Sequence, residues 1–587
     1  MNTKWASFGN PGYAAVCLWG LFFQGCGPET PPNPAPQVQP VEASPPLAPR
    51  TPLASSEVDI LPEFDEVSAE MGIHAPYFTD TVPKRYFLPE VMGGGATWLD
   101  FDQDGMLDLY LTNGTRFEPD TSPPPRGNWL YRGRESAPFQ LVAETCGAGD
   151  TGYGQGSAAG DFNSDGFPDL YVGNYGPNAL YVNEGDGTFS HDTTDPGLAD
   201  PAWTSSVLWA DLNQDGLLDV YVTNYLQVTL ANRKVCEYEG RPGYCGPGQY
   251  ESAADHVFLN QGNGLFVESA AELGMADTSG KGLAIAAADL NADLIPEVYV
   301  ANDMTPNFLY TTKGLGAGTA VVYSNVADIG GAAQSGEGMN AASMGIACAD
   351  FDGDSLPDLF VTDYYNTQKT LYKNHGDLQF EDVSRRMGTA KTGYAYLGFG
   401  TVPLDYNGDG FDDLFIANGH VLGPEVKPDR MRAQILFNNR GKIFEDITPK
   451  LKGYFQKEWL GRGAASADYD NDGDLDLVST HLDDPAALLR NSTATGKGYI
   501  GFELTSPLRI HPCGTRLTIT TTAGQKTRSL ITGGSYLSSS DGRLLFHLEP
   551  NEQHVHVRID WTSGRVDEFT SLDSNRYWHI SEGRQPW

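Results

Sequence analysis

The chain has 587 residues, more than one domain usually needs, and a formal net charge of −38 from 76 acidic and 38 basic residues. No basic stripe offsets this charge, which argues against nucleic acid as a partner and against docking on anionic lipid through protein charge. We therefore expect an acidic protein of more than one domain that meets a membrane only through an attached lipid.

Residues 1–25 have the pattern of an export signal. Lys4 gives a thin positive region, and Ala14–Phe23 is apolar but too short to span a bilayer. The run ends in Phe-Gln-Gly-Cys, which resembles a bacterial lipobox, so we predict cleavage after residue 25 and lipidation of Cys26. An ordinary cleaved signal with an incidental cysteine is the alternative.

Residues 26–56 follow as a proline-rich tether. Proline at roughly every third position prevents a packed core and favours an extended chain. A lipid at one end and a folded body at the other predict an exported lipoprotein of the cell envelope, at the outer membrane or cell surface, or a secreted protein.

An aspartate-rich loop then recurs seven times. Each copy carries oxygen-bearing side chains at positions 1, 3, 5 and 9 and an apolar run after them. Alternating oxygen ligands followed by a sharp turn are how a short loop wraps a hard cation such as calcium. The predicted ligands are, loop by loop, Asp100, Asp102, Asp104 and Asp108; Asp161, Asn163, Asp165 and Asp169; Asp211, Asn213, Asp215 and Asp219; Asp289, Asn291, Asp293 and Glu297; Asp350, Asp352, Asp354 and Asp358; Asp405, Asn407, Asp409 and Asp413; and Asp468, Asp470, Asp472 and Asp476.

The seven loops differ at position 6. Five have glycine there, whereas Ser355 and Leu294 stand at this position in the other two. A branched side chain is strained where φ is positive, so we expect the loop at Asp289 to be weak or empty. We expect about six or seven Ca²⁺ ions, all structural, because the grouped carboxylates would repel one another without a cation.

Short strand-like segments follow each loop. In each copy, the last of these segments begins with an aromatic residue. Such a repeat predicts the blades of a β-propeller. A segment of the same type, Phe64–Ile73, precedes the first loop, and none follows the last. We therefore predict an all-β fold in which this segment closes a seven-bladed ring over residues 57–495. An eight-bladed ring with a degenerate copy between Tyr225 and His256 is the alternative.

The pattern changes from about Gly498 onward. Alternating strand-like segments continue without acidic loops, which predicts a separate small β domain over residues 496–587.

Among the cysteines, Cys236 and Cys245 share a loop whose Gly and Pro residues let the chain turn back. Because an exported protein permits disulfides, we predict a Cys236–Cys245 bond, with two free thiols as the alternative. Cys348 lies in an apolar run and is predicted to be buried.

These residues resemble a known family. The acidic loops are similar to the FG-GAP or VCBS-type repeats of integrin α-subunit propellers. The chain is closest to bacterial and animal proteins of the cartilage acidic protein family, which join such a propeller to a C-terminal ASPIC/UnbV domain. The segments that carry the resemblance are Tyr244–Pro247, Met344–Asp352, Gly398–Gly400, Asp405–Gly410, Asn418–Val421, Gly533–Ser540, Leu545–Phe546, Trp561–Gly564 and Glu582–Gly583. The resemblance implies a calcium-binding, extracytoplasmic propeller without established catalysis.

We expect a non-enzymatic recognition or adhesion protein whose partner is an extracellular or envelope protein or glycan. His420 is interpreted as a turn histidine bonded to backbone, and we predict no catalytic residue. The alternative is a calcium-dependent polysaccharide lyase or hydrolase that draws on Arg233, Lys234, Arg241 and Tyr244 in the long insertion. That insertion and the aromatic residues of the C-terminal domain are the best locations for ligand contact. The aromatic residues are Tyr536, Trp561 and Trp578, and we expect most of them to belong to the core instead.

Overall fold

The computed structural model describes residues 60–118, 127–191, 197–198, 200–312, 321–493, 495–507, 509–510 and 512–587. The predicted signal, Cys26 and the tether lie outside these residues. The chain separates into residues 1–56 and residues 57–587, and the second range forms one unit. Among the described helices, none combines the length and the apolar character that crossing a bilayer requires.

The fold is all-β, as predicted. Seven antiparallel sheets of one plan follow one another along the propeller, and in each of them an acidic loop joins the first strand to the second. The sheets consist of β2 (Ala96–Leu99), β3 (Asp108–Leu111), β4 (Trp129–Arg132) and β5 (Gln140–Leu141); β6 (Tyr153–Gly160), β7 (Asp169–Asn183) and β8 (Phe189–His191); β9 (Thr204–Ala210), β10 (Asp219–Asn224), β13 (His256–Asn260) and β14 (Phe266–Glu268); β15 (Gly282–Ala288), β16 (Glu297–Asn302), β17 (Phe308–Thr312) and β18 (Tyr323–Asn325); β19 (Ile346–Ala349), β20 (Asp358–Val361), β21 (Thr370–Asn374) and β22 (Phe380–Asp382); β23 (Gly398–Leu404), β24 (Asp413–Asn418), β25 (Gln434–Asn438) and β26 (Phe444–Asp446); and β27 (Gly461–Ala467), β28 (Asp476–His481), β29 (Ala487–Asn491) and β1 (Phe64–Glu66).

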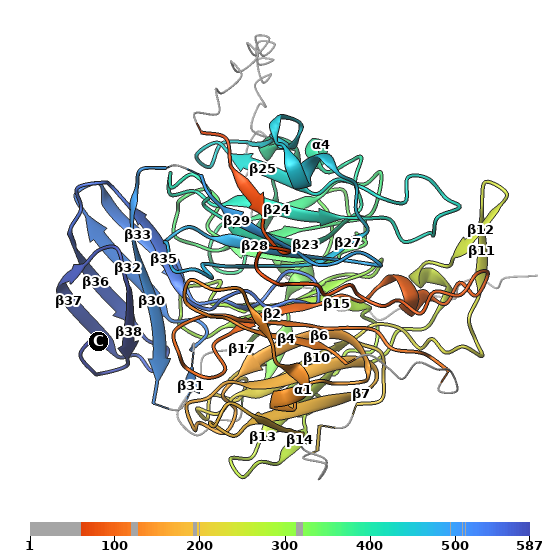
Figure 1. Cartoon of the computed structure of the whole chain (residues 1–587), viewed down its shortest axis with the longest axis horizontal. Helices are drawn as coiled ribbons and strands as arrows, with labels where there is room; N and C mark the ends of the chain where they lie inside the picture. Colours follow the sequence, from red (N-terminus) through yellow and green to blue (C-terminus); the bar gives the residue numbers. More distant parts are fainter. Residues whose placement is uncertain are drawn as a thin grey trace, which may run out of the picture. The chain divides into compact units, whose positions relative to one another are not determined.

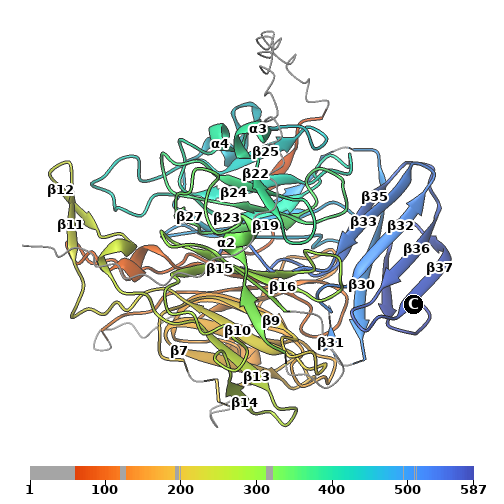
Figure 2. The ribbon, with the colours of Figure 1, turned by 180° about the vertical axis from the view of Figure 1, so that it is seen from behind.

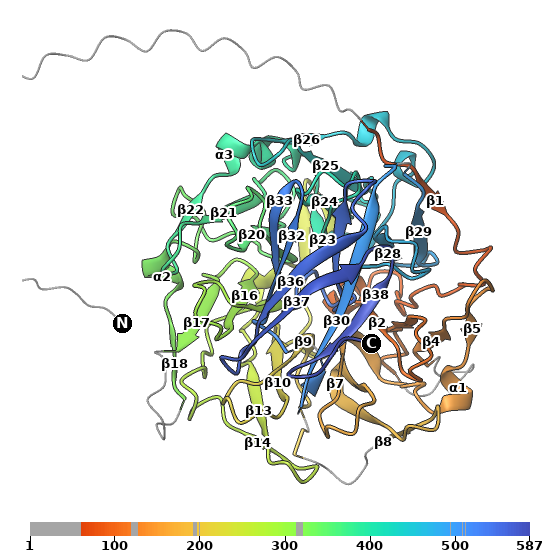
Figure 3. The same ribbon diagram turned by 90° about the vertical axis from the view of Figure 1, so that its left-hand side faces the viewer.

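The first strands of these sheets form a closed circuit. They contact one another in the order β2, β6, β9, β15, β19, β23 and β27, and β27 contacts β2 again. The sheets are arranged around this circuit as a ring (Figure 3). The first strands are rich in small residues because they crowd at the centre. A Cβ on Gly156, for example, would lie 2.4 Å from the carbonyl oxygen of Ser205 in the next sheet.

The N-terminal strand closes the ring. β1 pairs antiparallel with β29, with Phe64 opposite Asn491. This confirms that the segment before the first acidic loop completes the last sheet. The long insertion between Tyr225 and His256 holds only a hairpin, β11 (Val235–Tyr238) and β12 (Arg241–Tyr244), so the eighth blade suggested for it is wrong. The predicted Cys236–Cys245 disulfide joins the ends of the hairpin.

Asparagine side chains fasten neighbouring sheets together. An asparagine that ends the third strand donates its amide Nδ2 to a backbone carbonyl in the acidic loop of the preceding sheet. The four pairs are Asn183 with Phe101, Asn260 with Phe162, Asn374 with Leu290 and Asn438 with Phe351, at 2.7–2.8 Å. These buried bonds tie each of these four acidic loops to the next sheet as well as to its own.

Helices are few and short. They are α1 (Ala143–Cys146), α2 (Ala327–Gly330), α3 (Ser384–Met387) and α4 (Thr389–Thr392), with 3₁₀ turns η1 (Leu88–Val91), η2 (Pro247–Gln249), η3 (Thr448–Lys450) and η4 (Gly453–Gln456). Three of the α-helical turns directly follow a fourth strand, where they connect it to the next sheet.

The C-terminal residues form two further sheets that share one core. Their strands are β30 (Gly498–Ser506), β31 (Arg509–Ile510), β32 (Arg516–Thr521), β33 (Gly524–Ser529), β35 (Leu544–Leu548), β36 (His554–Asp560), β37 (Val566–Asp573) and β38 (Tyr577–Ser581). Apolar side chains from both sheets, Trp561 among them, fill the space between the sheets. Figures 1 and 2 show this domain on one side of the ring and hairpin β11–β12 on the other.

A segment of the C-terminal domain enters the centre of the ring. We call residues 532–543 the plug segment; it begins with β34 (Thr532–Gly533), which pairs with β15. Its backbone N–H groups donate to carbonyl oxygens of three first strands: Gly534 to Ile285 at 2.7 Å, Ser535 to Ile346 at 2.6 Å and Ser539 to Ala96 at 2.8 Å. Further bonds and a ring contact reach the other four first strands, at Ser157, Ser206, Phe399 and Ala464.

Tyr536 forms the tip of the plug segment. Its side chain is 1% exposed, its hydroxyl donates to the carbonyl of Met92, and its ring lies 4.8 Å from that of Phe399. Trp561 is equally buried within the C-terminal core. This confirms that most of these aromatic residues belong to the core, so Tyr536 and Trp561 offer no ligand surface. Trp578 remains partly exposed beside Arg576.

Candidate metal centres

The first carboxylate of each acidic loop caps the turn that follows it. In the first loop, the Asp100 side chain accepts from the backbone N–H of Asp104 at 3.1 Å and of Gly105 at 2.9 Å. The same pair of bonds is formed in the loops that begin at Asp161, Asp289, Asp350, Asp405 and Asp468. The sequence therefore folds each loop into the same compact turn.

Position 6 adopts the left-handed conformation that the sequence predicted. Gly473 has φ of 96°, and Ser355 and Leu294 have φ of 71° and 69°. The loop at Asp289 nevertheless keeps its turn, since the N–H of Leu294 donates to Asp289 at 3.0 Å. That this loop binds metal weakly stays a prediction, based on the strain of a branched residue at this φ.

The carboxylate at position 9 links the loop to two strands. Asp108 is fully buried and accepts from the N–H of Phe101 at 2.8 Å and from the N–H of Gly133, directly after β4, at 2.7 Å. Asp169, Asp219, Asp358 and Asp476 make the same two bonds at their own positions. Glu297 accepts from the N–H of Leu290 and from the Thr311 hydroxyl instead.

Burial disfavours the charged form of these carboxylates. Burial is the largest effect, and it raises the pKa of Asp169, Asp219 and Asp358 to about 8. Neighbouring carboxylates also raise the pKa, whereas the bonds from backbone N–H groups lower it. The pKa of Glu297 is also raised to about 8 by burial. A cation among these groups would remove the charge repulsion and favour the ionised form.

The donor set of the loops fits a hard divalent cation. Carboxylate oxygens come within 4.8 Å of one another in three loops, at Asp100, Asp102 and Asp108; Asp350, Asp352 and Asp358; and Asp468, Asp470 and Asp476. Buried carboxylate oxygens of Asp102, Asp352 and Asp413 lack a hydrogen-bond partner, and Asp413 is fully buried. Buried polar atoms are rarely left without partners, so unpaired oxygens inside these loops suit a metal ligand.

In the four loops with asparagine at position 3, its amide faces the carboxylate at position 5. Asn163 donates from Nδ2 to Asp165 at 3.0 Å, and Asn213 and Asn291 make the equivalent bond. The predicted ligands of each loop thus lie together in the fold. The structure brings no two loops together into a shared site, because each loop belongs to a different sheet.

The C-terminal domain covers two of the loops. His547 lies between Asp405, at 3.4 Å, and Asp474, at 3.2 Å, and the Tyr577 hydroxyl donates to Asp468 at 2.8 Å. Burial of His547 lowers its pKa, but the bonds to the carboxylates of Asp405 and Asp474 outweigh this effect and raise the pKa to about 9. Sequence reasoning missed these residues because they lie more than 70 positions away from the loops they cover.

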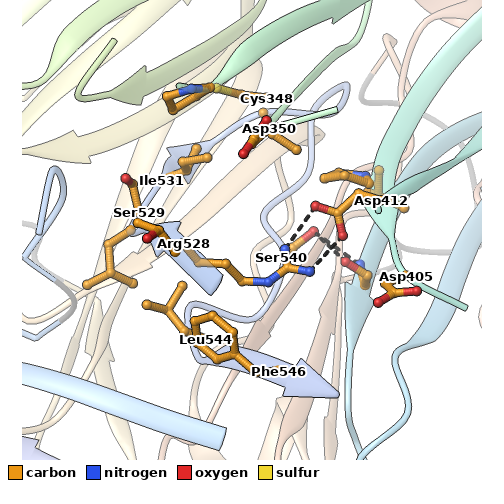
Figure 4. A pocket seen from close by; sticks show the side chains of 18 of the residues that line it. Cys348, Asp350, Asp405, Asp412, Arg528, Ser529, Ile531, Ser540, Leu544 and Phe546 are labelled. Atoms are coloured by element: carbon orange, nitrogen blue, oxygen red, sulfur yellow. Dashed lines mark hydrogen bonds and ion pairs between the residues drawn. The ribbon is translucent and has the colours of Figure 1, made fainter. Parts of the chain in front are cut away.

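A cavity of about 410 Å³ lies where the C-terminal domain meets the ring. Figure 4 shows Arg528 and Asp412 joined across it, with bonds of 2.9 and 2.8 Å between guanidinium and carboxylate. Ser540 of the plug segment and Asp405 also line it. This paired charge fixes the domain on the ring, and the plug segment runs along the wall of the cavity.

The residues considered for lyase chemistry are not assembled into a site. Arg233 and Arg241 donate to the backbone carbonyls of Leu230 and Glu425. The Tyr244 hydroxyl donates to buried Glu90 at 2.5 Å, and burial raises the pKa of Tyr244 well above its usual value. His420 accepts at Nδ1 from the N–H groups of Val421 and Leu422, which confirms that it is a turn histidine bonded to backbone.

Family comparison agrees with this architecture. The profile described as FG-GAP-like repeat matches residues 100–172, 161–222, 289–361, 350–416 and 405–479, and the profile described as ASPIC and UnbV matches residues 510–586. The chain belongs to the FG-GAP-like repeat proteins and ends in an ASPIC and UnbV domain. Among its curated relatives are proteins named cartilage acidic protein 1, which carry this domain architecture.

The relative from Xenopus tropicalis is 22% identical over 321 residues, covering 53% of this chain and 46% of that protein. The chain thus spans about half the length of the curated relatives it matches. An Agrocybe aegerita lectin that recognises non-reducing terminal N-acetylglucosamine has a TM-score of 0.36 at 15% identity, covering 68% of this chain and 94% of its own. A rhamnogalacturonan lyase has a TM-score of 0.31 at 13% identity, covering 87% and 92%. At these TM-scores neither structure bears on the function of this chain.

Repeats of this type joined to an ASPIC and UnbV domain suggest a scaffold for recognition or adhesion. The disulfide and the repeats also point to an extracellular protein, since such bonds persist in oxidising compartments.

Proposed function

We propose that the protein is a calcium-binding, non-enzymatic recognition or adhesion protein of the cell exterior, tethered to the envelope by a lipid on Cys26. The observation that carries the calcium role is the repetition of one buried carboxylate arrangement in seven sheets. Each ion would gather the carboxylates at positions 1, 3, 5 and 9, and so hold the turn between the first two strands of its sheet. The metal's contribution is structural.

The recognition surface is the face of the ring that carries hairpin β11–β12. The opposite face holds the acidic loops and is covered in part by the C-terminal domain, through contacts such as Arg528 with Asp412. Loops on a rigid scaffold are favourable places for binding. On the hairpin face, Met304, Met339 and Tyr394 are more than half exposed in loops that join neighbouring strands.

The partner is an extracellular or envelope protein or a glycan. The test is to apply the purified protein to an array of glycans and envelope proteins, in calcium and in excess EDTA, and to assay every glycan that binds for cleavage. We expect calcium-dependent binding without cleavage. New reducing or unsaturated sugar ends would contradict the non-enzymatic function and favour a lyase or hydrolase.

A pair of variants tests the location of the surface. Met304→Ser with Met339→Ser is expected to weaken binding at least tenfold, because exposed apolar side chains at an interface contribute to affinity when they are buried by the partner. Val267→Ser is the matched control, since Val267 is about as exposed but lies on the outer strand β14. Equal loss in both variants would contradict the placement on the hairpin face.

A further inference from the structure

The acidic loops are of two kinds. Three loops have an aspartate at position 3, namely Asp102, Asp352 and Asp470. The other four have an asparagine there, namely Asn163, Asn213, Asn291 and Asn407. The first kind therefore places one more carboxylate around the proposed ion than the second.

A residue on the third strand distinguishes the same two kinds. It continues the strand register opposite position 9, and in the sheets with aspartate at position 9 the residue after it donates its backbone N–H to that carboxylate. In the three loops with aspartate this residue is basic: Arg132, Lys373 and Arg490. In the four loops with asparagine it is uncharged: Val182, Leu259, Thr311 and Phe437. The correspondence holds in all seven sheets.

The basic side chains reach into their own loops. Arg132 contacts the carboxylate of Asp102 and lies 3.4 Å from that of Asp104. Lys373 contacts Asp352 and lies 2.8 Å from Asp354.

Arg490 has the same place in the last sheet, where its guanidinium lies 3.8 Å from the carboxylate of Asp65 on β1. The basic residues are 18–42% exposed on their side chains, so solvent screens part of the interaction.

The pairing equalises the charge carried by positions 1, 3, 5 and 9 together with the third-strand residue. Four carboxylates with one basic residue leave three net negative charges, and three carboxylates with an asparagine leave the same three. Without the basic residue, the fourth carboxylate would add repulsion to a loop whose carboxylates already lie within 4.8 Å of one another.

We infer that Arg132 and Lys373 are charge-compensating residues, which lower the calcium affinity of their loops to that of the asparagine loops and hold those loops folded without the ion. The inference rests on the proposed calcium role. The two kinds of loop then differ at position 3. One kind has a carboxylate there that is balanced by a basic residue of the third strand, and the other has a neutral amide that needs no such partner.

The experiment measures hydrogen–deuterium exchange of the loop peptides by mass spectrometry across a calcium titration, so that each loop has its own midpoint. The variants of the full chain are Lys373→Met, Asp352→Asn and the double variant, with Lys391→Met as a control at an exposed lysine in α4. Exchange reports the loop directly and does not depend on any activity.

Lys373→Met is expected to move the midpoint of the 350–358 loop to about tenfold lower calcium, because a positive charge near a divalent cation has been removed. The same variant is expected to exchange faster than wild type in EDTA. Asp352→Asn is expected to raise the midpoint about tenfold. The double variant should return to within about threefold of wild type, and the 405–413 loop should not change in any variant.

An unchanged midpoint of the 350–358 loop in Lys373→Met would overturn the inference, as would a double variant that is no closer to wild type than either single variant. These results are distinct from failure of the calcium role itself. If no loop in the wild-type protein responds to calcium, the proposed function falls and the inference falls with it.

Discussion

Replacing Tyr536 tests whether the plug segment holds the ring together. The side chain is buried among residues of several sheets and donates a hydrogen bond to Met92. Tyr536→Ala removes this contact and leaves a cavity, which costs about 3–5 kcal/mol for a large buried side chain. Tyr536→Phe loses only the hydrogen bond and leaves the carbonyl without its donor, at a cost of about 1–2 kcal/mol.

These energies correspond to measurable shifts of the melting temperature. For residues 57–587 the entropy of unfolding is about 1.1 kcal/mol/K, so Tyr536→Ala is expected to lower Tm by about 3–5 °C and Tyr536→Phe by about 1–2 °C. Differential scanning calorimetry in calcium gives both values. Tyr394→Ala, at a tyrosine that is 53% exposed, is the control and should change Tm by less than about 1 °C. If Tyr536→Ala has the same Tm as the Tyr394→Ala control, the reasoning is refuted.

Three further predictions concern the ring and the hairpin. Burial lowers the pKa of Lys369 to about 7. Between pH 7 and 10 the unfolded chain keeps the proton that folded Lys369 has lost, so the free energy of unfolding should rise by up to about 1.4 kcal/mol per pH unit. In denaturant titrations, Lys369→Met should remove this rise. Equal pH slopes in wild type and Lys369→Met would contradict the prediction. Asn374→Ala removes two buried bonds, one to Leu290 of the preceding sheet and one to Pro357 of its own sheet, and should lower stability by about 2–4 kcal/mol, whereas a loss below about 0.5 kcal/mol would exclude a role in fastening the sheets. Replacing Cys236 and Cys245 by serine should speed tryptic cleavage at exposed Lys234 without unfolding the ring, because the bond closes only a short loop; an unchanged cleavage rate would show that the hairpin is held by other contacts.

The repeating part of the fold could be predicted from sequence because its signals are local. Each acidic loop, its glycine and the strand that follows lie within a few residues of one another. The closing strand could be predicted too, since Phe64–Glu66 repeats the pattern that opens the last strand of other sheets. The hairpin disulfide followed from two cysteines separated by turn residues, and the buried position of Cys348 followed from its apolar neighbours.

The plug segment could not be predicted in this way. Its partners lie on all seven first strands, from 71 to 442 residues away along the chain, and no local pattern states which surface a loop will enter. Two glycines with positive φ, Gly533 and Gly534, mark a close approach of backbones, but glycine pairs also occur in ordinary turns. The sequence therefore predicted that most of these aromatic residues are core, but not that Tyr536 would lie at the centre of the ring.

The charge pairing could have been found from sequence and was missed. Aspartate or asparagine at position 3 is visible in every loop, and Arg132, Lys373 and Arg490 stand at one place in the third strand of their sheets. Only the strand register shows that this place faces position 9 of the loop. Differences between copies of a repeat can therefore be interpreted once the structure shows which positions are equivalent.

The most direct test of the calcium role is the melting temperature of the wild-type protein in millimolar calcium and in excess EDTA. An ion that binds only the folded state stabilises it by mass action, and several such ions add their effects. We predict that Tm falls by at least about 10 °C in EDTA and recovers when calcium is restored. The same Tm in calcium and in EDTA would contradict a structural role for calcium in this protein.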